Sequence, residues 1–269
     1  MAQLLDLLTV TPAGPGRWTG ECLEGSHGRI FGGQVLAQAM SAAAAACGTD
    51  RPLHAVHASF LRPGDPATPV TYTVTPLKTG RALTVLRADA GQADRLLLSA
   101  TVSFHDPEDS PDLQLPPPAV PAPDTLARSD YAPPGTNADV RRVFDIRYTD
   151  DAPLLDTPAQ PQQAVWFRAD SPLPAAGAVH ACALAYAIDL TLTRTAHMPL
   201  KRYPANRIGA SLDHSMWFHR PARADDWLLF AQRSTTYAGS RALSHAHLFD
   251  TAGRLVASAA QEALIRMRG

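Results

Sequence analysis

A proline-rich stretch in the middle of the chain restricts what this sequence can fold into more than any other feature. Nine prolines fall between Asp106 and Pro134. Proline fixes the backbone angle φ and has no N–H group to donate, so neither a helix nor a central strand can run through this stretch. We therefore expect a linker over residues 106–140 that separates an N-terminal domain, residues 1–105, from a C-terminal domain, residues 141–269.

Three short motifs occur in the same order and at similar spacing on the two sides of this linker. The matching segments are Phe60-Leu61-Arg62-Pro63 with Phe218-His219-Arg220-Pro221, Gly80-Arg81-Ala82-Leu83 with Ser240-Arg241-Ala242-Leu243, and Leu98-Ser99-Ala100 with Ala257-Ser258-Ala259. The alternative is chance similarity in a chain rich in alanine. Because both order and spacing agree, we interpret the motifs as an internal repeat, which predicts two copies of one structural unit.

Each half also contains one candidate helix followed by segments typical of strands. The first helix is expected to begin at Gly32-Gly33 and to stop at Gly48, and the second to run from Ala176 to about Thr195. Neither helix has a charged face, so both must be buried. The expected strands are His57–Leu61, Val70–Val74, Ala82–Ala88 and Leu96–Phe104 in the first half, and Ala210–Phe218, Trp227–Ser234, Ala242–Phe249 and Leu255–Arg266 in the second. This pattern predicts an α+β fold in which each unit combines one buried helix with an antiparallel sheet.

Composition restricts the partners and the compartment. The chain has 24 Lys and Arg against 25 Asp and Glu, and without a basic excess it is not expected to bind nucleic acid. Its three cysteines form no C-x-x-C pair, which favours a reducing compartment over a disulfide framework. No cationic start precedes a long apolar run, so we expect neither a signal peptide nor a membrane span and predict a cytoplasmic protein.

Several motifs that mark common enzyme classes do not occur in the sequence. It contains no G-x-S-x-G, no G-x-x-x-x-G-K-[ST], no dinucleotide-binding fingerprint and no H-E-x-x-H, which are typical of serine hydrolases, nucleotide-binding proteins and zinc proteases. His245 and His247 share one face of an expected strand, but no carboxylate or cysteine stands at ligand spacing nearby. We interpret these two histidines as solvent-facing, and we expect neither a metal nor a cofactor.

Asp189 is a carboxylate in unusually apolar sequence surroundings. It follows the apolar run ACALAYAI on the second expected helix, with Tyr186, Ala185 and Cys182 one or two turns back on the same side. A carboxylate on an apolar, buried helix is costly unless it is partnered or serves a function. The alternative is a helix-terminal aspartate that faces a loop.

Gln261 and Ser211 are two more polar residues that we expect to face the interior. Alternation along the last expected strand places Gln261 on the same face as Leu255, three alanines and Ile265. A hydrogen bond within the core is the alternative explanation for this glutamine. Ser211 lies on an expected strand face with Asp213, Ser215 and Trp217, so its hydroxyl is able to point inward as well. In the second half, a carboxylate, a hydroxyl and an amide are thus candidates for one site.

The repeat makes this candidate site asymmetric. When the two halves are aligned by the repeated motifs, Leu53 corresponds to Ser211 and Val102 corresponds to Gln261. If both halves were only structural, there would be no reason for one half to have polar residues at two core positions where the other half has aliphatic residues. We therefore expect one working site, built by the second half, with Leu53 and Val102 in the core.

Five segments resemble the acyl-CoA thioesterase II family across nearly the whole chain except the linker. These segments are FGGQVLAQAM, HASFLRPGD, YAIDLTL, ASLDHSMWFHRP and VASAAQEALIR. The resemblance implies a tandem double hotdog, in which each unit is a long helix wrapped by an antiparallel sheet, and it implies a homo-oligomer. It also implies that Asp189, Ser211 and Gln261 hold the attacking water. Ser211 stands where the best-known members have threonine.

The resemblance implies hydrolysis of acyl-CoA thioesters to free acid and CoA, with Asp189 as general base and backbone N–H groups near a helix start stabilising the oxyanion. No metal, nucleotide cofactor or covalent acyl-enzyme is required. One alternative is a non-catalytic double hotdog that binds acyl-CoA or an acyl chain. Another is an enoyl-CoA hydratase-like hotdog enzyme, which would need an Asp/His pair near the helix, and the nearest histidine after Asp189 is His197.

Overall fold

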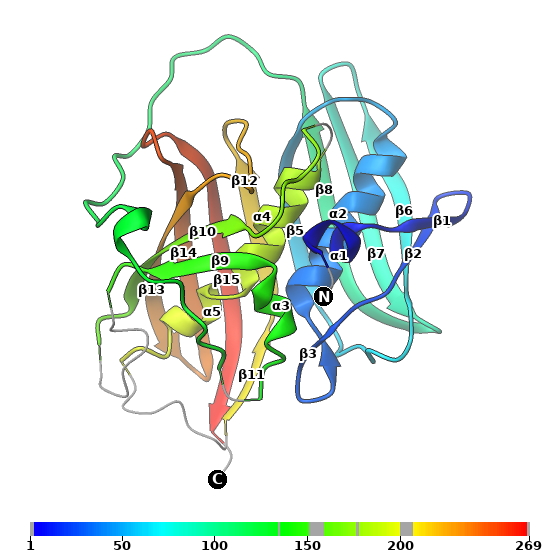
Figure 1. The fold of residues 1–269 in the computed structure, drawn as a ribbon. Coiled ribbons are helices and arrows are strands. Elements are labelled where there is room, and N and C mark those ends of the chain that lie inside the picture. Colours follow the sequence, from blue (N-terminus) through cyan, green and yellow to red (C-terminus); the bar gives the residue numbers. More distant parts are fainter. Residues whose placement is uncertain (1–2, 134, 151–158, 176–177, 200–206, 268–269) are drawn as a thin grey trace.

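The computed structural model describes residues 3–133, 135–150, 159–175, 178–199 and 207–267. One antiparallel sheet of 13 strands runs through both halves of the chain, in the order β1-β2-β6-β7-β8-β5-β12-β15-β14-β13-β10-β9, with β11 pairing β15 (Figure 1). Its central junction is the pairing of β5 with β12, which joins the two halves edge to edge. The short strands β3 and β4 form a separate hairpin.

The strands of the first half are β1 (Thr11–Gly14), β2 (Arg17–Gly20), β3 (Glu24–Ser26), β4 (Arg29–Ile30), β5 (Leu53–Phe60), β6 (Val70–Thr79), β7 (Leu83–Gln92) and β8 (Arg95–His105). Those of the second half are β9 (Phe144–Tyr148), β10 (Gln162–Ala169), β11 (Arg207–Ser211), β12 (Asp213–Phe218), β13 (Leu228–Ala238), β14 (Arg241–Asp250) and β15 (Leu255–Met267). The helices are α1 (Leu4–Leu8), α2 (Gly32–Cys47), α3 (Asp139–Arg142), α4 (Val179–Asp189) and α5 (Leu192–Thr195). A short 3-10 turn spans Pro123–Thr125.

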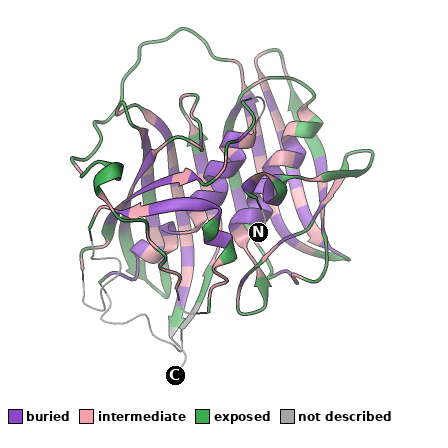
Figure 2. Ribbon diagram, viewed as in Figure 1, coloured by how far each residue is buried: buried purple, intermediate pink, exposed green. Residues whose placement is uncertain are grey.

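The two longer helices, α2 and α4, pack against each other inside the curved sheet (Figure 1). The small residues that line them allow close approach, and the Ser41 Oγ of α2 lies 3.4 Å from the Cys182 Sγ of α4. Both helices are buried along most of their length (Figure 2). The predicted limits of α2 are confirmed, because Gly48 ends it with a φ of 66°, in the left-handed region that favours glycine. The second helix is shorter than expected and ends at Asp189.

The internal repeat is visible in the register of the sheet. In the first half, an advance of five residues along β5 corresponds to four residues along its partner β8, and the same holds for β11 and β12 against β15 in the second half. The pairing register of each half therefore shifts by one residue at the same place. The paired residues are Leu53 with Phe104 and Ala58 with Ala100 in the first half, and Ser211 with Ala263 and Met216 with Ala259 in the second. The first and third motifs therefore mark equivalent structural positions. The second does not, because Leu83 pairs with His105 whereas Leu243 pairs with Glu262, two residues out of register.

This slip corrects one expectation. Ser211 was expected to share a face with Ser215 and Trp217, but Ser215 bonds the outward-facing His57 and Trp217 is partly exposed. The extra residue lies between β11 and β12, where Asp213 Oδ1 accepts a hydrogen bond from the backbone N–H of Glu262 at 2.9 Å. A β-bulge shifts the alternation by one residue, so Ser211 faces inward while the odd-numbered residues of β12 face outward.

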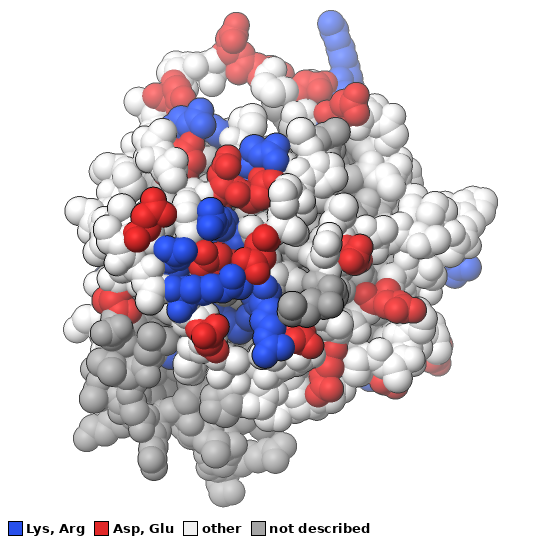
Figure 3. Space-filling view, in the orientation of Figure 1, with Lys and Arg blue, Asp and Glu red and all other residues white. Residues whose placement is uncertain are grey.

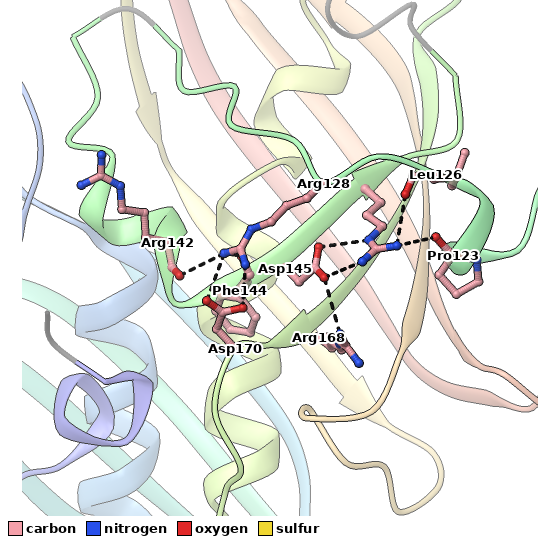
Figure 4. A network of polar contacts seen from close by, with 9 residues as sticks. Pro123, Leu126, Arg128, Arg142, Phe144, Asp145, Arg168 and Asp170 are labelled. Carbon is pink, nitrogen blue, oxygen red and sulfur yellow. Dashed lines mark hydrogen bonds and ion pairs between the residues drawn. The ribbon is translucent and has the colours of Figure 1, made fainter.

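The proline-rich linker lies along the outside of β9 and β10. Arg128 forms a two-pronged ion pair with Asp170, at 2.9 and 3.1 Å (Figure 4). Arg147 donates to the backbone oxygens of Pro123 and Leu126 at 2.9 and 3.1 Å. On this face arginines and carboxylates are interspersed (Figure 3). Ion pairs and hydrogen bonds thus fix the linker at several points.

No helix within the described parts of the chain is long and apolar enough to cross a membrane.

Candidate active site

Asp189, Ser211 and Gln261 come together at one point in the second half of the molecule. The Nε2 of Gln261, on β15, donates to Asp189 Oδ1 at 2.6 Å and to Ser211 Oγ at 2.9 Å. Ser211 Oγ, at the end of β11, donates to the same Asp189 oxygen at 3.3 Å. Three residues separated by 22 to 72 positions in sequence therefore form one hydrogen-bonded cluster.

Asp189 is the last residue of α4, as the helix-terminal alternative proposed. Its side chain contacts the other two polar residues and the start of α2, so that alternative is wrong about its surroundings. A Cβ on Gly33 would lie 2.8 Å from Asp189 Cβ and 2.7 Å from the ring of Phe31, and a Cβ on Gly32 would lie 3.3 Å from Asp189 Oδ2. The first turn of α2 approaches Asp189 this closely because both positions are glycine.

The start of α2, which adjoins Asp189, carries backbone N–H groups. The first N–H groups of an α-helix have no partner within the helix, and they carry the positive end of its dipole. Among the described residues, no side chain caps this helix at Phe31. The N terminus of α2, supplied by the first half, therefore faces the polar cluster supplied by the second half.

A cavity of about 810 Å³ opens beside the cluster. Asp189 and Ser211 line it, whereas Gln261, which is 1% exposed, does not and lies behind them. Much of the wall is apolar, and it includes Ile30, Phe31, Val35, Phe60, Leu61, Leu97, Leu98, Val140, Leu190, Leu212, Leu264 and Ile265. A cavity that combines an apolar wall with convergent polar groups is typical of a site that binds a small molecule.

The charged side chains around this cavity are mostly basic. Of the described residues, Arg29, Arg62, Arg141 and Arg194 line it together with a single carboxylate, Asp189. Arg141 is buried and donates to the Leu190 backbone oxygen at 2.8 Å and to the hydroxyl of Tyr148 at 3.3 Å. The whole chain has a formal charge of −1, so this surplus of positive charge is local and favours an anionic ligand.

Sequence reasoning missed His214. This residue of β12 is fully buried, and neither ring nitrogen has a hydrogen-bond partner among the residues that the structure describes. Burial lowers the pKa of His214, while the nearby carboxylates of Asp189 and Asp213 oppose that shift. The bulge that turns Ser211 inward also turns His214 inward, and strict alternation gave no signal of it. His214 does not line the cavity.

The positions equivalent to Ser211 and Gln261 in the first half are apolar core. Leu53 is 7% exposed and Val102 is 0% exposed, so the expectation for both is confirmed. His245 is exposed and His247 bonds Ser258 at the surface, also as expected. Within the described ranges, no three His, Cys, Asp or Glu side chains converge on a point that could hold a metal ion.

The fold and site together define a class of protein. Two buried helices are enclosed by an antiparallel sheet, and a hydrogen-bonded carboxylate, hydroxyl and amide adjoin an apolar cavity. A solved protein from Alicyclobacillus acidocaldarius, described as having a hot dog fold, matches this architecture with a TM-score of 0.82 over 99% of this chain and 98% of its own, at 19% identity. The chain therefore has a hotdog-type fold.

Comparison with known sequences identifies the family. Residues 23–105 match the family model of the acyl-CoA thioesterase N-terminal domain, and residues 107–265 match that of the C-terminal domain. Acyl-CoA thioesterase 2 of Haemophilus influenzae is 34% identical over 92% of this chain and 91% of its own. The crystal structure of acyl-CoA thioesterase II TesB2 from Mycobacterium marinum is 33% identical, with a TM-score of 0.86 over 99% of both chains. The chain belongs to the acyl-CoA thioesterase family.

Proposed function

We propose that this enzyme hydrolyses acyl-CoA thioesters with a water molecule activated by Asp189. The observation that carries the proposal is the hydrogen-bonded cluster of Asp189, Ser211 and Gln261 beside a cavity with an apolar wall. A carboxylate that lines such a cavity is placed to take a proton from a bound water. Ser211 lines the cavity with it and is able to hydrogen-bond the same water. Gln261 holds both side chains from behind.

In the proposed reaction the water oxygen forms a bond with the thioester carbonyl carbon while Asp189 takes one of its protons. The resulting oxyanion accepts hydrogen bonds from backbone N–H groups at the start of α2, near Gly32 and Gly33. The carbon–sulfur bond then breaks, and the proton passes from Asp189 to the departing sulfur. The products are a free carboxylic acid and CoA, and the Asp189 carboxylate is restored. No bond between the acyl group and the protein is needed.

The same proposal includes the organisation of the molecule. We assign residues 1–105 and 141–269 to two tandem hotdog units joined by the linker 106–140, and the repeated register slip supports this assignment. The second unit carries the polar side chains, and the first contributes the start of α2. We also propose that the enzyme is a cytoplasmic homo-oligomer.

The geometry of the same site bears on two alternative functions, an enoyl-CoA hydratase and a non-catalytic binding protein. An enoyl-CoA hydratase would need a histidine paired with Asp189 that reaches the substrate. His27 and His197 line the cavity, but the side chains that hydrogen-bond Asp189 are those of Ser211 and Gln261, and His214 is buried outside the cavity lining. A binding protein without activity would have no use for a carboxylate that shares two hydrogen bonds with a hydroxyl and an amide at the cavity wall. Both observations favour hydrolysis.

Release of free thiol from a series of saturated acyl-CoA substrates tests the proposal, and its variation with chain length reports the acyl preference. A single turnover in H₂¹⁸O, with enzyme in excess, tests the mechanism. Direct attack by water places one ¹⁸O atom in every molecule of acid. Unlabelled acid in this first turnover would instead show that a protein carboxylate attacks the thioester. No thiol release from any acyl-CoA would refute the proposed function.

A further inference from the structure

The charged groups of the cavity fall into two sets. Arg141 is buried and Arg194 is half-buried: Arg141 donates to two internal oxygens, and the guanidinium of Arg194 stacks on Tyr131 at 4.1 Å. Arg29 and Arg62 are exposed at the cavity rim. Within the described parts of the chain, neither of these two arginines forms an ion pair with a carboxylate of the protein. The rim thus carries two guanidinium groups with no anionic partner from the chain.

The backbone holds these two arginines on adjacent segments. The N–H of Ile30, the residue after Arg29, donates to the backbone oxygen of Gly64 at 3.1 Å. A Cβ on Gly64 would lie 2.3 Å from Ile30 Cδ1 and 2.8 Å from Leu97 Cδ1, so the absence of a side chain at Gly64 lets these two side chains pack against the loop that follows Arg62. Arg62 is further oriented by donating from Nη1 to the Leu96 backbone oxygen at 3.0 Å.

Both segments lead directly from the rim to the reacting centre. The β3–β4 hairpin that carries Arg29 lies at the lower end of α2 in Figure 1, and Gly32 follows three residues after Arg29. Phe60, two residues before Arg62, lies 3.1 Å from the position of a Cβ on Gly32, which in turn adjoins Asp189. A ligand that reaches from Asp189 along this wall therefore emerges between Arg29 and Arg62.

From this placement we propose that Arg29 and Arg62 bind the phosphate groups of the CoA moiety. The proposal rests on the proposed function, since it requires the thioester to lie at Asp189. A CoA thioester joins its reactive carbonyl to a diphosphate and a 3′-phosphate through an extended pantetheine arm, so its phosphates must lie at an edge of the cavity, away from the carbonyl. Guanidinium groups pair with phosphate through two parallel hydrogen bonds, and at an exposed rim they also attract the anion before it docks.

The test compares two substrates that share the acyl group and the pantetheine arm, of which only one carries the diphosphate and the 3′-phosphoadenosine. One is the acyl-CoA that the enzyme hydrolyses best, and the other is the same acyl group as a pantetheine thioester. Arg29→Gln and Arg62→Gln should each raise KM for the acyl-CoA about five- to fiftyfold while kcat stays within about twofold. KM for the pantetheine thioester should not change. Arg17→Gln, at an exposed arginine of β2 outside the cavity, is the matched control and should leave both substrates unaffected.

Two further experiments distinguish failure of the assigned phosphate contacts from failure of the proposed function. A dephospho-CoA thioester, which lacks the 3′-phosphate, shows which phosphate each arginine contacts, because its KM should respond to only those variants that bind the diphosphate. Calorimetric titration with free CoA measures the same contacts without turnover, and affinity should fall in the double variant. An unchanged affinity for CoA, or an equal rise of KM with both substrates, would overturn this assignment. A wild-type enzyme that binds CoA but hydrolyses neither substrate would refute the proposed function alone.

Discussion

Replacing Gln261 and its counterpart Val102 should have opposite consequences, because the repeat gives them equivalent positions and only one of them adjoins the polar cluster. Gln261→Met preserves most of the side-chain volume and removes the amide that donates to Asp189 at 2.6 Å and to Ser211 at 2.9 Å. A hydrogen bond to a charged group contributes about 1.5–3 kcal/mol. If that contribution is lost in the transition state, kcat falls about 10- to 150-fold.

Val102→Ala removes two methyl groups from a side chain with no exposed surface. Such truncations lower the free energy of unfolding by about 1–3 kcal/mol, which at this chain length lowers the melting temperature by about 2–12 °C. Its kcat per folded molecule should stay near that of the parent. The assays are thiol release at saturating acyl-CoA and thermal unfolding followed by circular dichroism. Equal losses of turnover in the two variants, or a lower kcat in Val102→Ala alone, would refute the asymmetry.

Three further predictions follow from the same geometry. Ser211→Ala should lower kcat roughly ten- to a few hundredfold because it removes one hydrogen bond to the water, whereas Ser211→Thr should stay within a few-fold of the parent; an active alanine variant with an inactive threonine variant would mean that the site needs space and no hydroxyl. Gly33→Ala should reduce kcat at least about tenfold, since its Cβ would lie 2.8 Å from that of Asp189 and overpacking costs about 1–3 kcal/mol; unchanged kinetics would show that the contact is not needed. Burial lowers the folded-state pKa of His214, so the unfolded chain binds a proton at this side chain more readily than the folded chain does. The free energy of unfolding should therefore fall by about 1.4 kcal/mol for each pH unit below pH 6.5. In urea unfolding between pH 7.5 and 5, the free energy of unfolding of His214→Gln should depend less steeply on pH than that of the parent, and identical slopes would contradict this prediction.

Much of the site could be predicted because it depends on simple periodicities. Two-residue alternation along β15 placed Gln261 inward, and glycines at both ends delimited α2. Asp189 stood out because a carboxylate follows a run of apolar residues on a buried helix. These signals are local, and each one survives in the folded chain because burial of the apolar face decides the orientation of the whole element.

The remainder depends on contacts between segments that are distant in the sequence. The inward direction of both Ser211 and His214 results from a one-residue slip against β15, and a slip is a property of a strand pair that alternation within one strand does not reveal. The strands β9 and β10 were not expected, since neither shows clear alternation and both are fixed by pairing with neighbours. The same is true of Gly33, which sequence marked as a helix start and which the structure places against Asp189.

The most direct test of the account is the turnover of Asp189→Asn. This change keeps the size of the side chain and its ability to accept a hydrogen bond, but it removes the base, so kcat should fall on the order of 10²-fold or more. Asp145→Asn is the matched control, because Asp145 is a buried carboxylate that pairs with Arg147 at 2.9 Å outside the cavity. The control should lose stability while its folded fraction keeps the parental kcat. Near-parental turnover in a folded Asp189→Asn protein would contradict the assignment of Asp189 as the base.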